Sequence, residues 1–151
     1  LTSIAYDQAV EDALCYGWID GQAKSYDESS WIQKFTPRRP KSIWSKLNTE
    51  RAQQLIESGK MRPAGMAAIE AAKKDGRWDA AYDYPKNATV PDDLQAALDA
   101  NPEAANFFAT LSGSNRFAIL FRIQQAKRPE TRAKRIADFV AKLERHEKIY
   151  P

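Results

Sequence analysis

Three short stretches decide the fold class: WIDGQAKS at residues 18–25, DESS at 27–30 and WIQKFT at 31–36. The outer two are rich in aromatic and β-branched residues, and the polar stretch between them is typical of a turn. We therefore predict a β-hairpin, with Gly21 weakening its first strand or marking a bulge. Alternation along the second strand places Trp31, Gln33 and Phe35 on one face of the hairpin.

The sequence around the hairpin predicts helices. Apolar spacing indicates a first helix over residues 6–16, ended by Gly17. Proline, glycine and capping residues mark the later ones, which we place at 42–58 and 63–76, from Pro91, from Pro102, after Gly113 and from Pro129. Residues 77–89 are predicted to be a loop packed on the body through Trp78, Tyr82 and Tyr84. The fold class is therefore α+β: mostly helical, with a small N-terminal β-hairpin or sheet and a C-terminal helical module.

A chain of 151 residues can bury one hydrophobic core. We predict a single domain over 1–151, with the hairpin and its helices at 1–76 and the helical module at 90–151. Because an isolated hairpin is marginally stable and residue 1 is Leu, we expect an upstream N-terminal segment that packs beside the hairpin.

Two further features concern the setting of the protein. The sequence has no apolar run of about 20 residues and no leader with a basic start and an apolar centre, so we expect no membrane span and no export. The single cysteine fits a reducing compartment. We therefore expect a cytoplasmic protein.

The net charge of +3 conceals four blocks of alternating sign. Residues 1–33 carry −5, residues 34–62 carry +6, residues 63–121 carry −3 and residues 122–151 carry +5. Folding can gather the two basic blocks into one face that attracts phosphates or acidic partners. It can equally pair them with the acidic blocks. Both interpretations stay open from the sequence.

Few residues have the pattern of a catalytic or metal site. His146 lies between charged residues near the C-terminus, which indicates a surface position, and Cys15 lies on the apolar side of the first helix. No phosphate-binding glycine loop, nucleophile elbow or metal-binding helix motif is present. We predict no catalytic residues, no metal and no cofactor, and lean against an enzyme.

Residues 31–46, WIQKFTPRRPKSIWSK, combine cations with aromatic rings. Arginine side chains bind phosphate or carboxylate groups in a bidentate way, a helix start near Ser42 adds main-chain N–H groups, and aromatic rings can stack on bases. The candidate ligand- or anion-binding residues are Arg38, Arg39, Lys41, Trp44, Asp20 and Trp31. The structural alternative is a tight connection whose Trp31 and Trp44 lie in the core.

A second basic segment, residues 122–135, places Arg128, Arg132 and Arg135 on one side of a helix. This arrangement is typical of a solvated face opposite an apolar one, and it also allows contact with an anion.

The stretches EDALCYGWIDGQ at 11–22 and FTPRRPKSIWSK at 35–46 resemble the YdeI/OmpD-associated family, also described as bacteriocin-protection proteins. VPDDL at 90–94 and AKRPETR at 126–132 are similar to that family's C-terminal helical module. The resemblance covers almost all of the chain, and members carry several dozen further residues before this start. It implies protection against bacteriocins or cationic antimicrobial peptides and association with an outer-membrane porin, and it implies no catalytic residues.

Three functions follow as hypotheses. The first is a non-enzymatic bacterial stress-protection or interaction protein with a protein or peptide partner, for which the acidic first block is the local candidate surface for a cationic peptide. The second is a nucleic-acid or phosphate-ligand binder that uses residues 31–46. The third is an enzyme acting on an anionic small molecule through Asp20 and Arg38. The sequence leaves the oligomeric state open.

Overall fold

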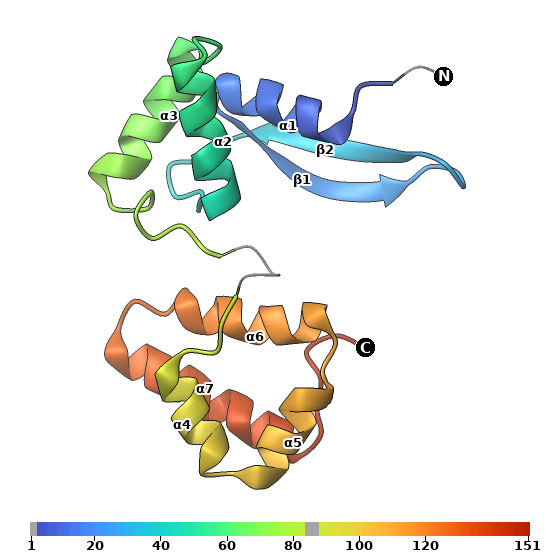
Figure 1. Cartoon of the computed structure of the whole chain (residues 1–151), viewed down its shortest axis with the longest axis vertical. Helices are drawn as coiled ribbons and strands as arrows, with labels where there is room; N and C mark the ends of the chain where they lie inside the picture. The colour runs from blue at the N-terminus through green and yellow to red at the C-terminus, as the bar shows by residue number, and fades with distance from the viewer. Residues whose placement is uncertain (1–2, 84–87) are drawn as a thin grey trace. The chain divides into compact units, whose positions relative to one another are not determined.

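The computed structural model describes residues 3–83 and 88–151, and their elements confirm the predicted α+β class (Figure 1). In chain order these are α1 (Tyr6–Cys15), β1 (Trp18–Ser25), β2 (Trp31–Pro37), α2 (Lys46–Glu57), α3 (Pro63–Lys74), α4 (Asp92–Asp99), α5 (Pro102–Thr110), α6 (Gly113–Gln124) and α7 (Pro129–Glu144). The chain divides into two compact units, Leu1–Ala81 and Tyr82–Pro151, which are described separately. The single domain over 1–151 stays a prediction.

The hairpin forms as predicted. β1 and β2 pair antiparallel, with Trp18 opposite Pro37 and Ser25 opposite Trp31. The register shifts between Asp20 and Ala23, which confirms an irregularity at Gly21. Figure 1 shows the hairpin extending alongside α1. Its second strand lines a hollow of about 300 Å³ with Trp31, Gln33 and Phe35, so these three side chains share a face as expected.

Close approach of main chains joins α1 to α3. Gly17 has φ +76°, a left-handed conformation that ends α1 at little steric cost. Gly65 is buried in the first turn of α3, where a Cβ would overlap the carbonyl oxygens of Leu14 and Cys15. Main-chain contact of this kind requires a residue without a side chain.

A buried tryptophan lies at the centre of the first unit. Trp44 is 2% exposed and belongs to a cluster with the apolar faces of α1, α2 and α3. The helix predicted from Ser42 begins only at Lys46, because the Ser45 side chain accepts a hydrogen bond from Asn48 N and caps α2 there. The prediction of a helix over 42–45 is therefore wrong.

The second unit contains the predicted helical module. Its core joins apolar side chains of all four helices: Leu94, Leu98, Ala104, Phe108, Ile119, Leu120, Ile123, Ile136, Phe139 and Leu143. Asn101 caps α5 and Ser112 caps α6. The buried Asn115 accepts hydrogen bonds from the main-chain N–H groups of Ile149 and Tyr150, which fastens the C-terminal tail to α6.

The expected loop lies partly within the described residues. Trp78 packs against Trp44, with ring centroids 5.0 Å apart, and Tyr82 packs against Phe121 at the same separation. Both contacts agree with the predicted packing, while Tyr84 lies outside the described residues. None of the described helices has the length and apolar character needed to span a membrane.

We expect Gly65→Ala to lower the free energy of unfolding of the first unit by about 1–3 kcal/mol, because the added methyl group overfills the contact between α1 and α3. Urea unfolding followed by tryptophan fluorescence measures this, since all four tryptophans lie in residues 18–78. Gly21→Ala is the matched control, because its Cβ would meet Lys34 O at an ordinary 3.5 Å. Equal stability of the two variants would contradict the close-approach argument.

Candidate functional site

Trp44 and Arg38, two of the predicted ligand-binding residues, support each other inside the first unit. The Arg38 guanidinium lies over the Trp44 ring, with Cζ 3.5 Å from the ring centroid. Trp44 also contacts Trp78 and is almost fully buried. A ring that is covered in this way is not accessible for stacking on a nucleobase. The contact is a desolvated cation–π pair that stabilises the fold.

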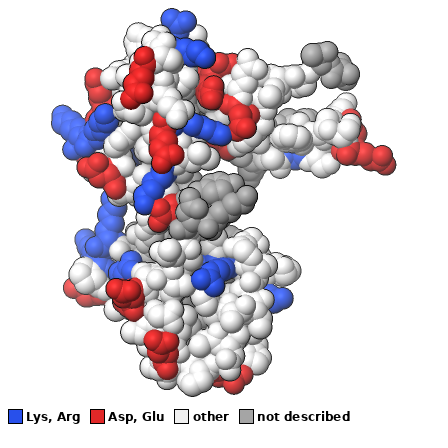
Figure 2. Space-filling model, viewed as in Figure 1, with Lys and Arg blue, Asp and Glu red and all other residues white. Residues whose placement is uncertain are grey.

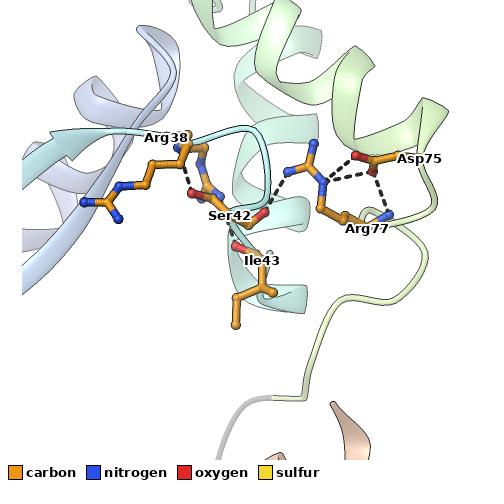
Figure 3. Close-up of polar contacts among 6 residues, drawn as sticks. Arg38, Ser42, Ile43, Asp75 and Arg77 are labelled. Carbon is orange, nitrogen blue, oxygen red and sulfur yellow. Dashed lines mark hydrogen bonds and ion pairs between the residues drawn. The ribbon is translucent and has the colours of Figure 1, made fainter. Parts of the chain in front are cut away.

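Two guanidinium groups donate hydrogen bonds to main-chain carbonyl groups of the connection between β2 and α2 (Figure 3). Arg38 Nη1 donates to Ile43 O at 3.1 Å, and Arg77 Nη1 donates to Ser42 O at 2.7 Å. Arg77 is held in turn by two hydrogen bonds from its Nε to the Asp75 carboxylate. The Ser42 hydroxyl accepts from Arg39 N at 2.8 Å. The connection is therefore braced internally. Of the two tryptophans that the structural alternative places in the core, Trp44 is buried and Trp31 is 56% exposed, so that alternative is wrong for Trp31.

The other candidates lie apart from this pair. Arg39 and Lys41 are exposed, and neither side chain makes a hydrogen bond or ion pair within residues 3–83 and 88–151. Trp31 is 56% exposed and lines the hollow beside α1. Asp20 Oδ2 accepts from Tyr6 Oη at 2.7 Å. Burial, followed by this hydrogen bond to the carboxylate, raises the pKa of Tyr6 to about 12.

These positions leave fewer accessible side chains for the phosphate- or nucleic-acid-binding hypothesis and for the enzyme hypothesis. A phosphate or nucleic-acid site keeps Arg39 and Lys41 as accessible cations, whereas Arg38 and Trp44 are engaged in the fold. The enzyme hypothesis needs Asp20 and Arg38 to meet a substrate. In the structure Asp20 accepts a hydrogen bond from Tyr6 of α1, and Arg38 donates one to Ile43 O in the connection before α2. Both functions stay predictions, now with fewer accessible groups.

The charge blocks pair with one another within each unit. Among the described residues, ion pairs that join a basic block to an acidic one include Arg51 with Asp7 at 2.5 Å and Arg132 with Asp93 at 2.5 Å. On the face seen in Figure 2, basic and acidic side chains are interspersed over the helices of Leu1–Ala81. This pattern favours mutual neutralisation over a single positive face.

Arginines of the second basic segment donate hydrogen bonds to carbonyl groups at the C-terminal end of α6. Arg132 Nη1 donates to Ile123 O at 3.2 Å, and Arg135 Nη1 donates to Arg122 O. The last carbonyl groups of a helix lack intrahelical donors, so these guanidinium groups satisfy them. Arg132 also forms two hydrogen bonds with the Asp93 carboxylate, and these hold the pKa of Asp93 below its usual range. Two of the three predicted surface cations are therefore structural.

An open groove between α4 and α7 is the candidate functional site. Its volume is about 630 Å³. Small and apolar side chains form its middle, and charged residues stand towards its ends; the lining consists of Asp93, Ala97, Pro129, Arg132, Ala133, Ile136, Ala137, Val140, Ala141 and Glu144. α7 has 16 residues, so the groove follows a helix about 24 Å long. These dimensions fit a helical segment laid along α7.

The two ends of the groove differ in charge. At the first end, the Asp93–Arg132 pair neutralises itself. At the second end, Glu144 makes no ion pair in the part of the chain that the structure describes, and it stands in the last turn of α7. A helix C-terminus adds partial negative charge there. The lining of the groove is therefore apolar along its length, with the Glu144 carboxylate at one end; Lys142 stands in the same turn of α7 but outside the lining.

The remaining nucleophilic and basic groups have structural surroundings. Cys15 is buried, and its burial raises the pKa of the thiol, which keeps it protonated and unreactive. His146 stacks on Phe107 and contacts Glu103 at the surface. No cluster of three or more His, Cys, Asp or Glu side chains suited to a metal ion occurs among the described residues.

Sequence reasoning did not identify the groove. It assigned the apolar side of the last helix to Ile136, Phe139, Val140 and Leu143, and three of these are buried. The available signal was the spacing of Ala133, Ala137 and Ala141, which share a second stripe of α7 at intervals of four residues.

Comparisons with known proteins divide the chain at nearly the same place as its structure. Residues 87–146 match the family model described as Bacteriocin-protection, YdeI or OmpD-Associated, which confirms the resemblance over that range. Residues 1–68 match a separate model, Domain of unknown function (DUF8412), and the motifs at 11–22 and 35–46 lie within it. No curated protein and no solved structure matches the chain. The groove, formed by residues 93–144, lies within the first match.

We expect Arg38→Ala to destabilise the first unit by about 2 kcal/mol or more, because it removes the cation over Trp44 and the donor to Ile43 O. Lys41→Ala is the control. Lys41 is exposed in the same connection, so its loss should change the free energy of unfolding by less than about 0.5 kcal/mol. Urea unfolding followed by tryptophan fluorescence compares the two. An Arg38→Ala protein as stable as the parent would return Arg38 to the accessible ligand-binding candidates.

We expect Asp93→Asn to destabilise the second unit at pH 7 by about 1 kcal/mol, since the pair with Arg132 is partly exposed and screened by solvent. The folded-state pKa of Asp93 is lowered, so its contribution is present above about pH 4 and is lost as the pH falls through the lowered pKa. The difference between parent and variant should therefore shrink below pH 4. Amide hydrogen exchange of fragments from residues 88–151 measures it; a difference independent of pH would contradict the assignment.

Proposed function

We propose that this protein, whose residues 87–146 match the Bacteriocin-protection, YdeI or OmpD-Associated family, is a non-enzymatic interaction protein that binds an amphipathic helix in the α4–α7 groove. The helix belongs to a protein or peptide partner. The groove carries the proposal, because it is an open apolar hollow of about 630 Å³ inside the family-matched stretch.

Side-chain size supports a helical partner. Ala133, Ala137 and Ala141 leave the surface of α7 low, while Val140 stands beside them, half-buried against the core. Helices pack at interaxial distances of 8–10 Å, depending on the side chains at the contact, and alanine permits the shorter values. An amphipathic helix can therefore place its larger apolar side chains in the groove, in the helix-in-groove mode of recognition.

Charge supports a cationic partner. Glu144 is the charged lining residue at one end of the groove, whereas Arg132 at the other end is paired with Asp93. A lysine or arginine near one end of the bound helix would complement Glu144. Cationic amphipathic helices are also the chemistry of many antimicrobial peptides.

The biological role that we propose takes bacteriocin protection from the description of the matched family. We extend it to a bacterial stress-protection function that includes antimicrobial peptides. A cytoplasmic location, consistent with the single cysteine, is part of the same proposal. Association with OmpD, which the family description names, is a further part of this proposal.

We expect a fluorescently labelled helical peptide of leucine and lysine, with one apolar face and about 18 residues, to bind the full chain. Ala137→Lys places a cation in the groove and should weaken binding at least about tenfold, which corresponds to about 1.4 kcal/mol. Ala96→Lys, on the exposed side of α4 and outside the groove lining, should leave the affinity unchanged. Fluorescence anisotropy measures all three.

Two comparisons make this test decisive. A peptide with glutamate in place of lysine should bind more weakly, and Glu144→Gln should reduce the dependence of binding on salt. Equal loss of affinity in Ala137→Lys and Ala96→Lys would contradict binding in the groove. Failure of the lysine peptide to bind the parent chain would contradict the proposed function.

A further inference from the structure

A hollow beside the C-terminal half of α1 is lined by charges of both signs. Its volume is about 230 Å³, and all of its lining residues belong to the first unit. Glu11 and Asp12 of α1 contribute two carboxylates to the lining. Lys60 and Arg62, from the connection between α2 and α3, contribute two cations. Opposite charges therefore border one small space.

Local structure fixes both sides of this hollow. Arg62 N donates to Cys15 O at 3.2 Å, which joins the connection between α2 and α3 to the end of α1. Met61 packs against the core of the first unit, whereas Lys60 and Arg62 on either side of it are exposed. On α1, Glu11 and Cys15 are four residues apart and therefore share one face of the helix.

The four charged side chains are unpaired among the described residues. None of them makes an ion pair or a side-chain hydrogen bond within residues 3–83 and 88–151. Elsewhere in the first unit the same two charge blocks do pair directly, as in Arg51 with Asp7. Here the two signs border the hollow without meeting, so a ligand that carries both charges can bridge them.

Two buried side chains, Cys15 and Leu55, supply an apolar part of the lining. Cys15 is 6% exposed, and its thiol makes no hydrogen bond in the part of the chain that the structure describes. Burial raises the pKa of this thiol, the acidic side chains of α1 raise it further, and Arg62 and Lys60 lower it, so both signs of charge act on one atom. A protonated thiol packs as a small apolar group.

We propose that this hollow binds a small zwitterion of the α-amino acid class. The carboxylate of the ligand meets Lys60 and Arg62, since an arginine fork matches a carboxylate. The ammonium group meets the two carboxylates of α1, and an apolar side chain lies against the thiol and Leu55. At about 30 Å³ for each water-sized group, 230 Å³ holds roughly eight of them, which is the size of one amino acid and not of a peptide.

Three ligands that differ in charge test the class of ligand on the full chain. L-Leucine carries both charges, 3-methylbutylamine lacks the carboxylate, and 4-methylpentanoate lacks the ammonium group. We expect leucine to shift the amide NMR signals of residues 8–16 and 58–62 with a dissociation constant of about 1 mM, and each analogue to bind at least about tenfold more weakly. No shift with about 10 mM leucine, or an analogue that binds as tightly as leucine, would overturn the proposal.

Neutralising either pair of charges tests the residues. Lys60→Gln combined with Arg62→Gln should weaken leucine binding at least about tenfold, and so should Glu11→Gln combined with Asp12→Asn. Both double variants should keep the urea midpoint of the parent, because the substituted side chains make no ion pair or hydrogen bond among the described residues. A double variant that folds and binds leucine as tightly as the parent would refute this site.

The matched controls remove exposed charges of each sign outside the hollow. Glu50→Gln on α2 and Lys74→Gln on α3 should leave the affinity for leucine within about twofold of the parent value. Losses in these controls equal to those of the double variants would indicate a response to net charge and would contradict binding in the hollow. Either outcome is separate from the α4–α7 groove, whose lining residues all belong to the second unit.

Discussion

Burial of Trp44 is the constraint on which the first unit depends. An indole with 2% exposure is covered by its neighbours, which here are apolar side chains of α1, α2 and α3, the Trp78 ring and the Arg38 guanidinium. Arg38 lies over the ring and also donates to Ile43 O, so it links the buried indole to the connection between β2 and α2. The most basic stretch of the chain is therefore directed partly inward, and α2 begins at Lys46, after that connection is complete.

The arginines have a common structural use in both units. Arg38 and Arg77 donate to carbonyl groups of the connection before α2, and Arg132 and Arg135 donate to carbonyl groups at the end of α6. A guanidinium group is suited to this position, because it can bond a carbonyl while its other donors meet a carboxylate or its plane lies on a ring. Basic composition in this protein consequently indicates internal support as well as exposed charge.

In the second unit, α7 carries two sets of residues: those that pack in the core or brace α6, and those that line the accessible groove. On α7, Ile136, Phe139 and Leu143 enter the core, and Arg132 closes α6. The alanine stripe that remains borders the groove, with Glu144 at one end. Motifs that resemble a family, such as AKRPETR at 126–132, thus contain residues that hold the helices together, whereas the accessible groove is lined by residues with little chemical character of their own.

The sequence determined the elements, because their signals are local: alternation and a polar turn for the hairpin, Gly17 and Pro63 for helix boundaries, and Asn101 for a cap. It also placed Trp31, Gln33 and Phe35 on one face. Tertiary structure decided which cations face inward, where α2 begins and where the groove lies. These depend on partners distant in sequence: Arg77 reaches Ser42 across 35 residues, and Arg132 reaches Asp93 across 39. The exposure of an arginine or an alanine is set by what packs beside it; local spacing shows which side chains share a stripe of a helix, but it does not identify the neighbour.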